Sequence, residues 1–87
     1  MSSSAEMFLK HAASVVVERR AQYGEAGAAM TAIADRWSIT LGCKVTPAQV
    51  VLCLIDLKLV RLVRDPAHED SAVDVCGYTA LLHEVAS

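Results

Sequence analysis

The chain has 87 residues, of which 54% are hydrophobic, and its formal net charge is −2. This length predicts one domain, and the lack of a basic excess argues against binding to long nucleic acids. The cysteines, Cys43, Cys53 and Cys76, are too widely spaced to predict a zinc site or a disulfide framework.

The apolar content is high for so short a chain, because a small domain buries only a modest part of its surface. We therefore expect a homo-oligomer that buries helix faces between subunits; a very well packed monomer is the alternative. No stretch reaches the roughly 18 uncharged apolar residues typical of a membrane span. The apolar part of the N-terminus does not follow a basic segment, so no signal peptide is predicted, and we expect a cytoplasmic protein with no membrane partner.

Two helices are predicted in the first half of the chain. Ser3 and Glu6 form a capping-box pattern, which predicts a first helix over residues 4–23 that ends at Gly24. A second helix is predicted over residues 25–41, with apolar residues at helical spacing on one face. Gly42 is expected to end it.

The third predicted helix covers residues 47–64 and has the clearest start signal. Thr46 is a suitable N-cap, Pro47 fits the first helical position, and Gln49 completes a capping box. The segment is apolar nearly all round, which is typical of a buried helix. We therefore expect it to be the central helix of the domain.

The last predicted helix covers residues 71–85. Pro66 disfavours helix just before it, and Gly77 lies inside it at a cost of about 1 kcal/mol relative to Ala. An interior glycine of this kind suggests the close approach of a neighbour or a ligand. No strand-like alternation is present, so we predict a single all-α domain over residues 1–87, built as a compact four-helix bundle.

The end of the first helix is the first candidate binding region. Arg20 and Tyr23 are three residues apart and share a face, next to Arg19 and Gly24. A guanidinium beside an aromatic ring is suited to holding a phosphate and stacking a base. A solvated helix end is an equally weighted alternative.

Lys58 and Arg61 form a second candidate group, three residues apart on the nearly apolar third helix. Cations that are partly enclosed need carboxylates or an anionic ligand as partners. The sequence leaves both possibilities open.

Asp70 and Asp74 lie four residues apart at the start of the last helix, with Tyr78 one turn further on. Two carboxylates on one face can hold Mg²⁺. They can equally form salt bridges with Lys58 and Arg61, and Asp70 can act as an N-cap. We favour the salt-bridge and cap interpretation over the metal site.

Four strings of the sequence carry a family resemblance: RRAQYG, WSITLG, VTPAQVVLCLIDLKLVRL and HEDSAVDVCGYTALL. Together they resemble an uncharacterised family of small proteins from tailed phages and prophages, over residues 17–85. That family in turn resembles the MazG-type all-helical nucleoside triphosphate pyrophosphohydrolases. Those enzymes hold Mg²⁺ with E-x-x-E and E-x-x-D pairs and form dimers or tetramers.

The sequence departs from the MazG-type pattern at its carboxylates. It contains no E-x-x-E, and Asp70 and Asp74 are four residues apart rather than three. The resemblance therefore implies a nucleotide pocket more strongly than it implies hydrolysis.

We accordingly expect a protein that binds, and thereby sequesters, a nucleotide or nucleotide signal in the bacterial host cytosol without efficient turnover, as in phage counter-defence. A Mg²⁺-dependent nucleoside triphosphate pyrophosphohydrolase is one alternative, and a structural or protein-interaction module is another. The expected ligand-binding residues are Arg19, Arg20, Tyr23, Gly24, Lys58, Arg61, Asp70, Asp74 and Tyr78.

Overall fold

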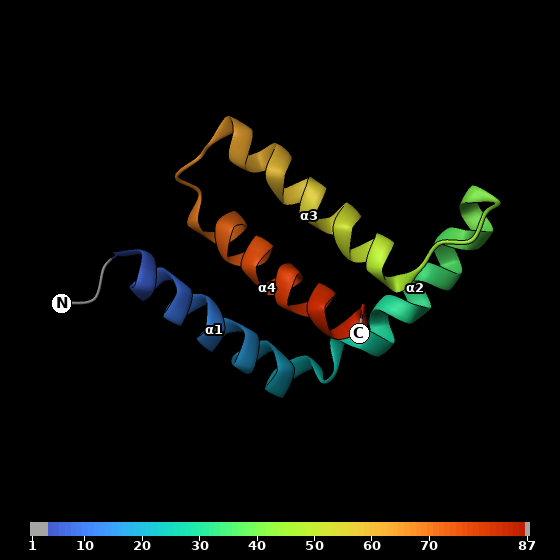
Figure 1. Ribbon diagram of the computed structural model, residues 1–87, viewed down its shortest axis with the longest axis horizontal. Helices are drawn as coiled ribbons and strands as arrows, with labels where there is room; N and C mark the ends of the chain where they lie inside the picture. The colour runs from blue at the N-terminus through green and yellow to red at the C-terminus, as the bar shows by residue number, and fades with distance from the viewer. Residues whose placement is uncertain (1–3, 87) are drawn as a thin grey trace.

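The computed structural model describes residues 4–86 and contains four α-helices (Figure 1). They are α1 (Ser4–Tyr23), α2 (Ala26–Leu41), α3 (Pro47–Arg64) and α4 (Glu69–Val85). No strand occurs within this described range. The predicted all-α class and the number of helices are confirmed.

The helix at the centre of the fold is α4, which packs against each of the other three helices. Figure 1 shows α1, α4 and α3 side by side in one layer, with α4 in the middle, while α2 crosses the end of the layer where α3 begins. The prediction that α3 is the central, buried helix is wrong. One face of α3 packs on α2 and α4, and its other face is exposed.

The main core lies where α2 meets the start of α3. Met30 and Ala34 of α2 pack with Val50 and Val51 of α3, and both valines are 0% exposed. Partly buried side chains from α4 close this cluster, among them Tyr78, Leu81, Leu82 and Val85. The core therefore fixes the C-terminal half of α4 against α2 and α3.

The four helices form a more open arrangement than the compact bundle that we expected. The principal extents are 50 × 31 × 22 Å, and the radius of gyration is 14.3 Å. A compact domain of this length has a radius of gyration of about 12 Å. The difference arises because α1 packs chiefly on α4 and the outer face of α3 is uncovered.

Three of the predicted helix ends are confirmed by their geometry. Gly24 and Gly42 have positive φ angles of 77° and 70°, and each donates its N–H to the carbonyl four residues earlier. Thr46 and Gln49 form the predicted capping box, with N···O distances of 2.9 and 3.2 Å. The predicted cap at Ser3 lies outside the described residues.

The start of α4 differs from the prediction. The helix begins at Glu69, and its N-cap is His68 rather than Asp70. The Nδ1 atom of His68 accepts the Ser71 N–H at 3.2 Å and lies 2.8 Å from the Ser71 hydroxyl. An imidazole nitrogen thus takes the place of the usual carboxylate or hydroxyl cap. None of the described helices is both long and apolar enough to cross a membrane.

Candidate functional site

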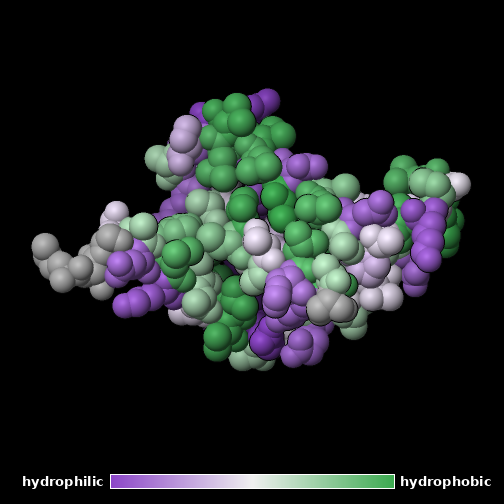
Figure 2. Space-filling view, in the orientation of Figure 1, coloured by the Kyte–Doolittle hydropathy of each residue, from purple (hydrophilic) through white to green (hydrophobic). Residues whose placement is uncertain are grey.

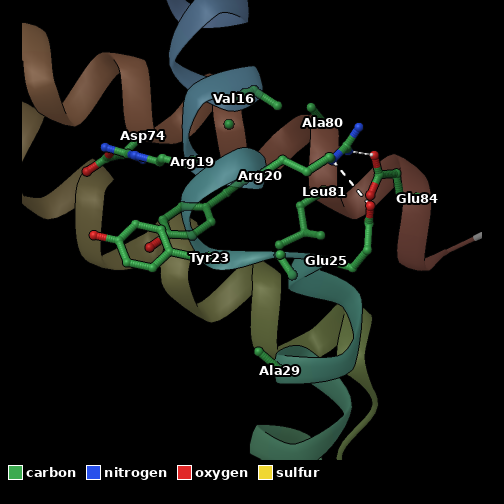
Figure 3. A pocket seen from close by; sticks show the side chains of 14 residues that line it. Val16, Arg19, Arg20, Tyr23, Glu25, Ala29, Asp74, Ala80, Leu81 and Glu84 are labelled. Atoms are coloured by element: carbon green, nitrogen blue, oxygen red, sulfur yellow. Dashed lines mark hydrogen bonds and ion pairs between the residues drawn. The ribbon is translucent and has the colours of Figure 1, made fainter.

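A cavity of about 320 Å³ lies between the C-terminal end of α1, the first turns of α2 and the middle of α4 (Figure 3). Its volume falls at the lower end of the range of small-molecule sites, about 300–1,000 Å³. Its apolar wall is formed by Val16, Ala29, Ala80 and Leu81. We call this cavity the α1/α4 pocket.

Six of the nine residues expected to bind a ligand line the α1/α4 pocket: Arg19, Arg20, Tyr23, Gly24, Asp74 and Tyr78. The first four come from the end of α1 and the turn after it, and the last two come from α4. The fold thus brings two predicted groups together that are about 50 residues apart in the sequence. Lys58, Arg61 and Asp70 do not line the pocket.

At one edge of the pocket, the Asp74 carboxylate forms ion pairs with basic side chains of two other helices. Its Oδ1 atom lies 2.9 Å from Nη1 of Arg19, and its Oδ2 atom lies 3.1 Å from Nζ of Lys58. Partial burial raises the pKa of the Asp74 carboxyl, but the hydrogen bonds and charges of Arg19 and Lys58 outweigh burial and hold this pKa below its ordinary value. Asp74 is therefore an ionised link between α1, α3 and α4.

Arg20 faces the opposite side of the pocket. Figure 3 shows Arg19 pointing toward Asp74, whereas Arg20 extends toward Glu25 and Glu84. Arg20 forms a short hydrogen bond with Glu84, and its Nε atom lies 3.7 Å from Glu25 Oε1. The sequence reading missed both glutamates. Arg20 and Glu84 are 64 residues apart, so no local spacing signals their contact.

Lys58 and Arg61 have different partners although they are one turn apart. Lys58 binds Asp74, which agrees with the salt-bridge interpretation. The Nη2 atom of Arg61 lies 3.2 Å from Nε2 of His68, at the start of α4. Because Nδ1 of His68 accepts the Ser71 N–H, its Nε2 atom carries the ring proton and cannot accept from Arg61, so of the two cations it is Lys58 that ties α3 to α4.

The two predicted magnesium ligands, Asp70 and Asp74, have different surroundings. Asp70 is exposed and stands apart from the pocket, and both oxygens of Asp74 contact cations. Among residues 4–86, no group of three or more His, Cys, Asp or Glu side chains is placed to hold a metal ion. A metal bound through Asp74 would have to displace Arg19 and Lys58, and the magnesium site stays a prediction.

Comparisons with known proteins give one family and one relative. The family model of a domain of unknown function, DUF6378, matches residues 7–86. The gene 55 protein of Mycobacterium phage L5 is 33% identical over 79 residues, which cover 88% of this chain and 51% of that protein. The chain thus spans about half the length of this relative. No solved structure matches the chain significantly.

Proposed function

The chain belongs to the DUF6378 family, and from that premise we propose that it binds a nucleotide in the α1/α4 pocket without turning it over efficiently. One observation carries the proposal: Arg20, Tyr23 and Tyr78 line the same cavity, together with apolar side chains, Arg19 and the three carboxylates that pair with the arginines. A guanidinium can hold a phosphate through two parallel hydrogen bonds. An aromatic ring can stack a base, for about 1–3 kcal/mol per base.

Arg20 is the residue that exchanges partners when a phosphate binds. Its carboxylate partners are open to solvent: the Glu25 side chain is 72% exposed and that of Glu84 is 43% exposed. Exposed ion pairs are worth about 0–1 kcal/mol, so a phosphate can replace them at little cost. Tyr23 is 76% exposed beside Arg20, which leaves its ring open to a base.

Asp74 supports binding rather than hydrolysis. A Mg²⁺-dependent pyrophosphohydrolase needs free carboxylate oxygens for its metal ions. In this chain the two oxygens of Asp74 are engaged by Arg19 and Lys58. We also propose that the chain is distantly related to the MazG-type enzymes. Because those enzymes act on nucleoside triphosphates, this relationship favours a nucleotide as the ligand.

The phage relative bears on the setting of the proposed activity. A phage gains when a small protein removes a nucleotide signal that its host uses in defence, and simple sequestration achieves this. We propose such counter-defence as the setting of the binding activity, since the gene 55 protein belongs to a phage.

A thermal-shift screen of the intact chain tests the proposal. Mono-, di- and cyclic nucleotides are added without metal, because a ligand that binds only the folded state must stabilise it. At about 100 times Kd the gain is about 2.7 kcal/mol, which raises Tm by about 10 °C or more for a chain of this size. Arg20→Gln should abolish the shift, whereas Arg36→Gln, a change at an exposed arginine of α2 outside the pocket, should preserve it.

Other outcomes separate the alternatives. A panel in which no nucleotide changes Tm contradicts the proposal and favours a structural role for the ion pairs. Release of pyrophosphate in the presence of Mg²⁺, lost in Asp74→Ala, shows a hydrolase instead.

A further inference from the structure

The outer face of α3 exposes a group of large apolar side chains. Val63 is 82% exposed, Leu57 66% and Val60 60%, and Leu52 and Leu59 are about half exposed at 48% and 44%. Figure 2 shows hydrophobic residues gathered over the outer end of α3. Scattered apolar residues are ordinary on a monomer, but a contiguous patch of this kind marks an interaction surface.

Helical geometry places Val60 at the centre of this face. With 100° per residue, Asp56 and Arg64 lie four residues before and after Val60 and about 40° to either side of it. They are about 12 Å apart along the helix axis. The outer face thus has an apolar centre, an acidic group toward one end and a basic group toward the other.

We propose that a second copy of this chain covers the outer face of α3, with the two α3 helices antiparallel about a two-fold axis beside Val60. A two-fold interface must be complementary to itself. In this register each Asp56 lies level with the partner's Arg64, and the long guanidinium side chain can reach across. A parallel pair would bring like charges together, which opposes association. The charge pattern of the face therefore fits an antiparallel copy of itself.

The same copy accounts for the exposure of apolar side chains on α3. An 87-residue chain with 54% hydrophobic residues has more apolar surface than this arrangement of helices covers. Pairing at α3 buries the part of that surface that α3 carries, whereas the exposed apolar side chains of α1 and α2 lie elsewhere. The residues that line the α1/α4 pocket come from α1, α2, α4 and the turn between α1 and α2, so the pairing is independent of ligand binding.

The mass of the intact chain in solution tests the pairing, measured by light scattering or sedimentation across micromolar concentrations. We expect twice the 9.3 kDa of one chain. Val60→Glu places like charges at the two-fold axis and should yield a monomer that keeps its helical circular dichroism. The control is Val17→Glu, at a 69% exposed valine on α1, which should remain dimeric.

Charge exchange tests the register and does not depend on whether Val60→Glu folds. Asp56→Arg alone, and Arg64→Asp alone, should each raise the dimer Kd at least about tenfold, because like charges then face each other. The double variant should restore the Kd to within about threefold of the original. A wild-type chain that is monomeric throughout, a dimer unaffected by a folded Val60→Glu variant, or a double variant that stays weak overturns the proposal.

Discussion

The Nζ atom of Lys58 lies 3.1 Å from Oδ2 of Asp74 and joins α3 to α4. The same carboxylate holds Arg19 of α1 through its other oxygen. The Asp74 side chain is 16% exposed, so these contacts are partly shielded from water. One carboxylate thus ties three helices together, and α1 depends on it because α1 packs chiefly on α4.

We predict that Asp74→Asn lowers the free energy of unfolding by about 1–2 kcal/mol at pH 7, because it removes charge-assisted hydrogen bonds. The pKa of Asp74 is lower in the folded chain than its ordinary value of 3.8. The stabilisation is therefore fully present above pH 3.8 and is lost as pH falls through the folded-state pKa. Urea unfolding of both proteins at a series of pH values measures this.

The control for that experiment is Asp35→Asn, at an exposed carboxylate on α2. It should change the unfolding free energy little at any pH. A difference between wild type and Asp74→Asn that does not shrink as pH falls below 3.8 would contradict the assigned role, since protonation of Asp74 removes the charge that Arg19 and Lys58 contact.

Gly77→Ala and Gly24→Ala test two different roles of glycine. Gly77 leaves room in the pocket, and Gly24 adopts a left-handed backbone conformation. A Cβ added at Gly77 would lie 3.8 Å from Cγ2 of Val16, an ordinary contact. Gly77→Ala should therefore raise stability by about 1 kcal/mol through helix propensity, measured as a higher Tm. Because Gly77 lines the α1/α4 pocket, the added methyl group should also weaken nucleotide binding.

Gly24→Ala should have the opposite effect on stability. Gly24 has a φ angle of 77°, although nothing lies within 4 Å of its added Cβ. The cost therefore comes from the left-handed backbone alone, about 1–2 kcal/mol. If Gly24→Ala were neutral, or Gly77→Ala destabilising, the geometry of the α1 end and of α4 would be in question.

His68→Ala should lower the unfolding free energy by about 1 kcal/mol, since it removes the N-cap of α4. It also removes the ring nitrogen beside the hydroxyl of Ser71, a residue that is 3% exposed. His68→Asn keeps a capping acceptor and should recover most of the loss. Chemical denaturation of the three proteins measures the order, and equal stability of the Ala and Asn variants would contradict the capping role.

Arg20→Gln should cost less than about 1 kcal/mol in stability, because its ion pairs are exposed. A loss of nucleotide binding in this variant would then reflect the missing guanidinium rather than unfolding. Thermal unfolding without ligand checks this. A large fall in Tm would show instead that Arg20 mainly holds α1 to the end of α4.

Local signals predicted the helix ends well, because a cap is decided within four residues. Thr46 and Gln49 form their capping box, and Gly24 and Gly42 end their helices with positive φ angles. The start of α4 was missed because histidine is an uncommon cap. The acceptor role of His68 depends on its contact with Ser71.

The burial of α3 was mispredicted for a different reason. Apolar residues all round a helix show how much surface must leave water, but they do not show which chain covers it. Val50 and Val51 are covered by this chain, whereas Val60 and Val63 are exposed. Apolar residues occur on both faces of the helix.

The parts of the candidate site that the sequence predicted best are residues one turn apart on a helix. Arg20 and Tyr23 follow from helical spacing, and both line the pocket. The contact of Lys58 with Asp74 is among the salt bridges favoured from the sequence, whereas the contact of Arg20 with Glu84 depends on how the helices pack. No periodicity within one helix encodes such contacts.

Nucleotide binding in the α1/α4 pocket is measured by calorimetric titration of the intact, metal-free chain. The ligand is the nucleotide that gives the largest thermal shift. Saturable binding with one ligand for each α1/α4 pocket is expected, lost in Arg20→Gln and retained in Arg36→Gln. Absence of binding heat for every nucleotide in the panel, or equal binding by both variants, would contradict the proposed function.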